Sequence, residues 1–96
     1  MGVKLIRIHA EDNVGVAVQA IEKGEHVRTA AGDEIVAQDN IKYGFKVALR
    51  AIERGAAIIK YAELIGHASK DITPGESVHT HNVDPLPIPD VYVQIT

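Results

Sequence analysis

The sequence predicts a small, mostly β domain, and three observations carry this prediction. Its 96 residues are 46% hydrophobic and 24% charged, which is enough for one modest core. With three tyrosines and one phenylalanine as the only aromatic residues, that core must be built from Val, Ile, Leu and Ala. Short β-branched runs alternate with turn-forming residues along most of the chain, a pattern typical of strands joined by tight turns.

Seven runs are expected to form strands. "VGVAV" places three valines on one face and Gly15 with Ala17 on the other, which predicts the close approach of another layer. "HVRTA" and "EIVAQ" flank "AGD", which is a good hairpin signal. The expected strands span residues 3–9, 14–18, 26–30, 34–38, 45–49, 57–61 and 77–81.

One turn device recurs between these strands. "AVQAIEKGEHV", "ALRAIERGAAI" and "ASKDITPGESV" share a frame in which Ile follows Ala by four residues and Gly follows Ile by three. Each is expected to be a short turn that ends at a Gly with positive φ, after which a strand resumes. Three short amphipathic helices are the alternative, but helices of about eight residues are marginal. The three glycines are Gly24, Gly55 and Gly75.

Composition and charge exclude several classes of protein. The net charge is −3 and the Lys and Arg residues are scattered, which argues against a nucleic-acid partner. Without cysteine there is no disulfide, thiolate metal site or thiol nucleophile. The first apolar stretch is short and is interrupted by Lys4 and Arg7, and no run approaches the roughly 20 apolar residues of a membrane helix. We therefore expect a cytoplasmic protein that binds neither nucleic acid nor membrane.

Prolines at alternate positions set the last residues apart. Pro85, Pro87 and Pro89 do not suit a central strand. The predicted division is a β domain over residues 1–83 and a proline-rich extension or edge strand over residues 84–96. Within the extension, the side chains of residues 91, 93 and 95 are apolar and would share one face of a strand. This face predicts a surface for a partner chain or for a second copy of this chain.

The stretch "HTHN" holds the residues that are most suggestive of chemistry. If it continues a strand, His79 and His81 lie on one face and can converge on one divalent ion. Asn82 adds an amide that could bind a hydroxyl or a carboxylate. The alternative is that these residues form only the polar end of a strand.

His9 is a further candidate, because Glu11 and Asp12 follow it closely. If His9 lies across from the histidines of "HTHN", the histidines and a carboxylate would suit non-haem iron or manganese. The alternative is that Asp12 or Asn13 caps the turn into "VGVAV". The chain carries no P-loop, dinucleotide or G-x-S-x-G signature, and the "AGDE" hairpin lacks the lysine of a lipoyl or biotinyl carrier.

Four blocks in order carry a family resemblance: "IHAEDNVGVAV", "YGFKVAL", "IIKYAELIGHA" and "DITPGESVHTHN". Together they resemble the SAF domain of altronate and galactarate dehydratases, which also forms the small subunit of sulfolactate sulfo-lyase. The resemblance covers about residues 8–82 and implies a β-clip, a compact set of short, twisted strands. Two departures stand out. The family usually has Gly-His-Lys where this chain has Gly44-Phe45-Lys46, and it often has Gly where this chain has Ala62, which predicts no positive φ at the Tyr61-Ala62 turn.

The resemblance implies part of a lyase, a hydro-lyase that dehydrates a sugar acid in carbohydrate metabolism. It implies a large catalytic subunit or domain as the partner and iron(II), or else manganese(II), as the cofactor. His79, His81 and His9 are then the expected metal ligands, and Asn82 and Lys46 are the expected substrate contacts. The isolated chain is expected to be inactive. The alternatives are the small subunit of a sulfolactate sulfo-lyase and a non-catalytic module for assembly or gating.

Overall fold

The computed structural model describes residues 3–85, and every regular element in that range is a β-strand. The predicted mostly β, β-clip-like domain is therefore confirmed. No helix in the described range is long and apolar enough to cross a membrane. The strands are β1 (Leu5–Ile6), β2 (Val14–Ala17), β3 (His26–Arg28), β4 (Glu34–Val36), β5 (Lys46–Ala48), β6 (Ala57–Lys60), β7 (Glu63–Ala68), β8 (Ser77–Val78) and β9 (Val83–Pro85).

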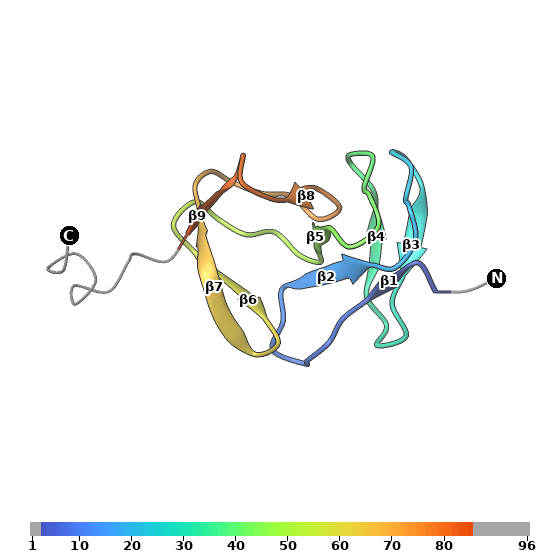
Figure 1. Ribbon diagram of the computed structural model, residues 1–96, viewed down its shortest axis with the longest axis horizontal. Coiled ribbons are helices and arrows are strands. Elements are labelled where there is room, and N and C mark those ends of the chain that lie inside the picture. The colour runs from blue at the N-terminus through green and yellow to red at the C-terminus, as the bar shows by residue number, and fades with distance from the viewer. Residues whose placement is uncertain (1–2, 86–96) are drawn as a thin grey trace, which may run out of the picture.

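The strands form three small antiparallel sheets. A four-stranded sheet has the order β1-β2-β5-β8, β3 and β4 form a hairpin, and β6, β7 and β9 form a three-stranded sheet in the order β6-β7-β9. In Figure 1 the β3–β4 hairpin lies at one end of the molecule, the β6–β7–β9 sheet lies at the other, and the four-stranded sheet joins them. The hairpin predicted around "AGD" is confirmed, with Val27 opposite Ile35.

The turn device that the sequence shows three times occurs four times. The copy missed from the sequence lies within "NIKYGFKV" and places Gly44 at φ +85°, close to the +85° to +91° of the other three glycines. The isoleucines of the four copies are buried and pair through two antiparallel bridges, Ile21 with Ile41 and Ile52 with Ile72. The predicted turns, rather than helices, are therefore what the structure contains.

The four turns divide the domain into two similar halves. Each pair of turns is closed by the side chain that precedes its second isoleucine: Asn40 accepts a hydrogen bond from the Lys23 N–H, and Asp71 accepts one from the Arg54 N–H, both at 2.9 Å. Each half buries its own apolar cluster, and the isoleucine side chains contribute about 1.5–3 kcal/mol each. The first cluster holds Leu5, Ala17, Ile21, Val27, Ile35, Ala37, Ile41, Val47 and Leu49; the second holds Val14, Ala48, Ile52, Ile58, Ala68, Ile72 and Val78.

Close packing explains Gly15, although the crowding comes from β1, a neighbouring strand of the same sheet, and not from another layer as predicted. A Cβ atom at this position would lie 2.9 Å from the Ile6 carbonyl oxygen and 3.0 Å from a methyl group of Leu5. The hydrogen at Gly15 therefore lets β1 lie directly against β2, with which it pairs from Leu5 to Ile6.

The strand predictions were wrong in two places. The strand expected over residues 77–81 ends at Val78, and the chain turns at once. The longest strand of the described range, β7, was not predicted, and it pairs with β9 through Gly66 and Pro85. Pro85, which lies in the predicted proline-rich extension or edge strand, ends the edge strand β9. The apolar row at positions 91, 93 and 95 lies outside the described residues.

Candidate functional site

An open groove of about 560 Å³ lies between the four-stranded sheet and the β6–β7–β9 sheet. Lys46 enters it from β5, Lys60 and Tyr61 enter from the end of β6, and His79 enters from the turn after β8. The remaining lining residues are Ile65, Thr80, Val83 and Pro85. The groove therefore combines three basic side chains with an apolar wall.

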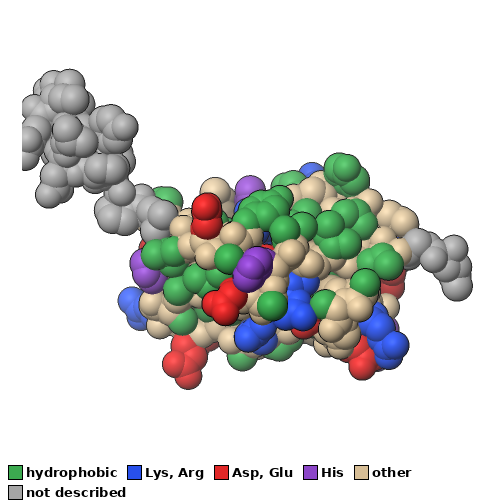
Figure 2. Space-filling model, turned by 90° about the horizontal axis from the view of Figure 1, so that it is seen from below, with side chains coloured by type: hydrophobic (Ala, Val, Ile, Leu, Met, Phe, Trp, Pro, Cys, Tyr) green, Lys and Arg blue, Asp and Glu red, His purple; other side chains and the backbone are tan. Residues whose placement is uncertain are grey.

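The surface of the molecule is unevenly polar. In the view of Figure 2, hydrophobic side chains cover much of one face, and charged side chains lie mainly toward its lower edge.

A four-residue turn fixes His79. The Asn82 Oδ1 atom accepts a hydrogen bond from the His79 N–H at 2.9 Å, and the Asn82 N–H donates to the His79 carbonyl at 3.0 Å. The Asn82 amide also donates to the Ser77 carbonyl at 2.8 Å, and its side chain is fully buried. The His79 ring packs on Phe45, with 4.8 Å between ring centroids. Asn82 thus holds the turn, and the turn presents His79 to the groove.

A second turn of the same design surrounds Asp12. Its Oδ2 atom accepts the His9 N–H at 3.1 Å, and its N–H donates to the His9 carbonyl. The same carboxylate also accepts the N–H groups of Tyr61, at 3.0 Å, and of Ala62, at 2.8 Å. Burial raises the pKa of Asp12, but the three backbone donors outweigh it and hold the pKa below its ordinary value.

The Tyr61-Ala62 turn corrects a prediction. Both residues have positive φ, +56° and +59°, although the sequence predicted none here. A two-residue hairpin between β6 and β7 matches the strand twist when both central residues have positive φ, as in a type I′ turn. This conformation costs about 1–2 kcal/mol for a residue other than Gly. The buried Asp12 carboxylate compensates, because it binds both N–H groups of the turn.

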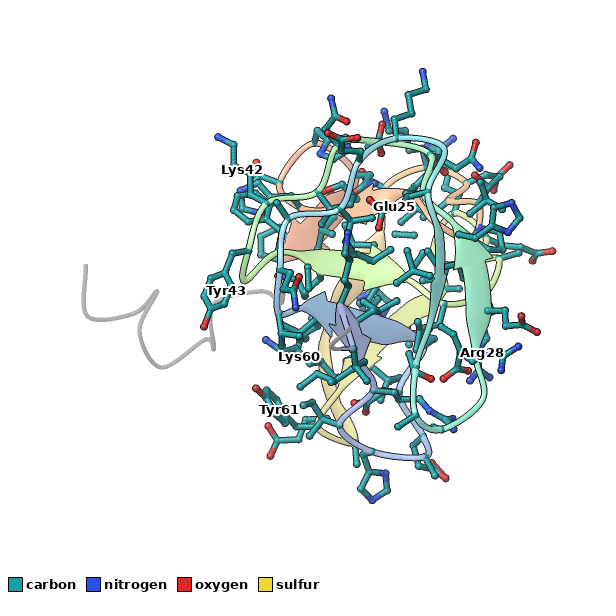
Figure 3. All side chains as sticks on the ribbon, turned by 90° about the vertical axis from the view of Figure 1, so that its right-hand side faces the viewer. Glu25, Arg28, Lys42, Tyr43, Lys60 and Tyr61 are labelled. Carbon is teal, nitrogen blue, oxygen red and sulfur yellow. The ribbon has the colours of Figure 1, made fainter. Side chains whose placement is uncertain are left out.

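Within residues 3–85, the lysines of the groove have no carboxylate partner. The three ion pairs found among residues 3–85 involve neither Lys46 nor Lys60. Both lysines are half-buried, and the pKa of Lys46 is lowered by burial first and by the nearby charge of Lys60 second. The Lys60 Nζ atom lies 4.9 Å from the centre of the Tyr61 ring. Figure 3 shows Lys60 and Tyr61 on the opposite side of the molecule from Arg28.

Another hollow of similar size, about 580 Å³, lies beside β3 and is less suited to binding an anion. Its lysine, Lys4, donates to Glu25 at 2.6 Å, and its arginine, Arg28, pairs with Glu34 at 2.9 Å. Because these cations are already neutralised, a bound anion would have to displace a carboxylate. The groove around Lys46 is therefore the candidate site.

A family comparison agrees with this architecture. The family model for the altronate/galactarate dehydratase SAF domain matches residues 3–85, which is the whole described range. The chain belongs to this family. The SAF domain is 48% identical over 77 residues to an altronate dehydratase of Bacillus subtilis and 40% identical over 77 residues to one of Escherichia coli. These matches cover 80% of the chain but only 15% of each relative.

A relative of a different kind is matched along nearly its whole length. It is the alpha subunit of a (2R)-sulfolactate sulfo-lyase from Chromohalobacter salexigens, 33% identical over 89 residues. This match covers 86% of the chain and 95% of the relative. SAF domains of this family thus occur both as a small part of a long chain and as a subunit of their own.

The predicted metal ligands are not gathered into a cluster within residues 3–85. No group of three or more His, Asp or Glu side chains within residues 3–85 is placed to hold an ion. His79 and His81 do not share a strand face, because they lie in the turn, and His81 and His9 do not line the groove. The Nδ1 atom of His9 accepts the Glu11 N–H at 3.1 Å, so the neutral ring carries its proton on Nε2 and offers no lone pair there. Metal binding by His79, His81 and His9 stays a prediction, and it needs ligands from beyond this range.

Of the expected substrate contacts, the structure places Lys46 in the groove and Asn82 behind it. A substrate contact by Asn82 stays a prediction that would require its turn to open. Lys60 and Tyr61 were not predicted. The one sequence feature that draws attention to them is that "IKY" occurs twice, at 41–43 and at 59–61. The repeat does not show which copy lies at the groove; the register of the β6–β7 hairpin places the second copy there.

Proposed function

We propose that this SAF domain forms one wall of a composite active site in a sugar-acid dehydratase like the altronate dehydratases. A large catalytic domain or subunit forms the opposite wall. The observation that carries this proposal is the groove in which Lys46, Lys60 and His79 meet without a carboxylate partner among the described residues. An open groove with unpaired lysines on a small domain suits an anionic substrate that a second surface encloses.

Two of the three basic side chains, Lys46 and His79, then have roles in β-elimination. The Lys46 ammonium binds the substrate carboxylate and stabilises the enolate-like charge that develops when the α proton leaves. His79, fixed by the Asn82 turn, is placed to deliver a proton to the departing hydroxyl. The base that removes the α proton, and the ligands of any iron or manganese ion, come from the catalytic partner in this proposal.

A second candidate is the small subunit of a sulfolactate sulfo-lyase. The similarity to the sulfo-lyase alpha subunit, 33% identical over 89 residues, supports it. The same wall would then bind the carboxylate of a sulfonated hydroxy acid, and sulfite would leave in place of water.

Exchanging Lys46 for glutamine tests the proposal in the assembled enzyme, meaning this domain together with its catalytic domain or subunit. We expect Lys46→Gln to raise KM for the acid about tenfold, because a half-buried charge pair is worth roughly 1–2 kcal/mol. Lys42→Gln, which changes an exposed lysine outside the groove, is the matched control and should leave KM unchanged. An unchanged KM in Lys46→Gln, with the complex intact, would contradict the proposed role.

A further inference from the structure

The groove holds more positive charge than one carboxylate needs. Lys46 and Lys60 both line it, both are half-buried, and neither is paired with a carboxylate in the part of the chain that the structure describes. The two charges repel each other, which is one cause of the lowered pKa of Lys46. A ligand with a single negative charge would compensate one lysine and leave the other facing the same groove.

The position of Lys60 is fixed by the fold. It is the last residue of β6, and its backbone lies opposite that of Glu63 in the β6–β7 hairpin, across the Tyr61-Ala62 turn. The turn is clamped by the buried Asp12, and the Lys60 ammonium lies over the Tyr61 ring. Lys46 enters from β5, in a different sheet. The two ammonium groups are therefore held on separate strands, with the apolar side chains of Ile65 and Val83 also lining the groove.

We propose that the groove selects hydroxy acids that carry two anionic groups over hydroxy acids that carry one. This inference rests on the proposed function, since it assumes that the groove receives the acid. Within that function it favours an acid such as galactarate or sulfolactate over altronate, whose single carboxylate would leave Lys60 without a partner. One carboxylate contacts Lys46, the second anionic group contacts Lys60, and the carbon chain between them lies against the apolar wall. The second group can be a carboxylate or a sulfonate, because both present oxygen acceptors with a negative charge to an ammonium.

Two matched pairs of acids test the selectivity. Galactarate and galactonate differ only in whether carbon 6 is a carboxylate or a hydroxymethyl group, and 3-sulfolactate and glycerate differ only in a sulfonate against a hydroxyl. The full 96-residue chain is titrated with each acid at low ionic strength, and backbone and side-chain NMR signals of the groove report the Kd. We expect the dianion of at least one pair to bind about three- to tenfold more tightly than its monoanion. The pair that shows the preference identifies the second group.

Variants of Lys60 show whether this lysine causes the preference for dianions. Lys60→Gln should remove the preference and leave monoanion binding within about twofold, whereas Lys60→Arg should keep the preference. Lys42→Gln controls for the overall charge of the chain and should keep it too. Equal affinity for both members of both pairs, or a preference that survives in Lys60→Gln, would overturn this inference and leave the proposed function standing. If none of the four acids perturbs the groove, the proposed function fails with it.

Discussion

Replacing Asp12 with asparagine is expected to lower the free energy of unfolding by about 2–4 kcal/mol. The two carboxylate oxygens accept three backbone hydrogen bonds, from His9, Tyr61 and Ala62, and Asp12 is fully buried. An asparagine amide can accept on one side only, so its NH₂ group would face N–H donors. Thermal unfolding should show a decrease in Tm of roughly 10 °C or more, because 1 kcal/mol shifts Tm by about 4–8 °C in a domain this small.

Two comparisons distinguish the loss of the carboxylate's hydrogen bonds from nonspecific destabilisation by the substitution. Ala62→Gly relieves the positive φ of the same turn and should raise the free energy of unfolding by about 1 kcal/mol. The low pKa of Asp12 also gives a sign to the pH dependence: its contribution is present above the unfolded pKa and is lost as pH falls through the lower folded pKa. Asp12→Asn should lack this acid-side component. An unchanged Tm in Asp12→Asn would show that the carboxylate does not clamp the turn.

Replacing Gly75 with alanine is expected to cost more than about 4 kcal/mol, which is a large part of the stability of a typical domain. A Cβ atom at Gly75 would lie 2.0 Å from the Val36 carbonyl oxygen and 2.9 Å from the Val36 carbonyl carbon. Both are backbone atoms, so no side chain can move to relieve the contact. The Gly75 carbonyl also accepts the Gln38 N–H, and the clash would therefore disturb the junction between the two halves of the domain.

Gly55 is the matched control, because it occupies the corresponding place in another copy of the same turn. Its φ of +85° is close to the +91° of Gly75, but an added Cβ would meet no atom within 4 Å. Gly55→Ala should therefore cost only the backbone term, about 1–2 kcal/mol. Chemical denaturation of both variants measures the difference. Similar losses in the two variants would contradict the close packing at Gly75.

The fold class could be predicted because its signals are local. The β-branched runs and the Ile-to-Gly frame lie within a few residues of each other, so the sequence alone indicates the turns. The fourth copy was missed because its Gly44 lies between "Tyr" and "Phe" in a segment that had been assigned in part to a strand. β7 was missed for a physical reason. Its turn, Tyr61-Ala62, has no turn-forming residue and depends on Asp12, which lies 49 residues away from Tyr61.

The candidate site was predictable only where one element determines it. Lys46 and His79 were named from the sequence, and both line the groove. The prediction that His79 and His81 lie on one face of a strand was wrong. The Asn82 side chain accepts the His79 N–H, and the chain turns instead of continuing the strand. Lys60 could not be placed from the sequence, since its position at the groove depends on the register of a hairpin whose second strand was not recognised.

Protection of lysines by the substrate shows whether this groove is a wall of the active site. The assembled enzyme is treated with an amine-reactive acetylating reagent, with and without a saturating concentration of the substrate. The rate of acetylation at each lysine is followed by mass spectrometry. We expect the bound substrate to slow modification of Lys46 and Lys60 severalfold and to leave that of the exposed Lys23 and Lys42 unchanged. Equal rates at Lys46 and Lys60 with and without an acid that the enzyme is turning over would contradict it.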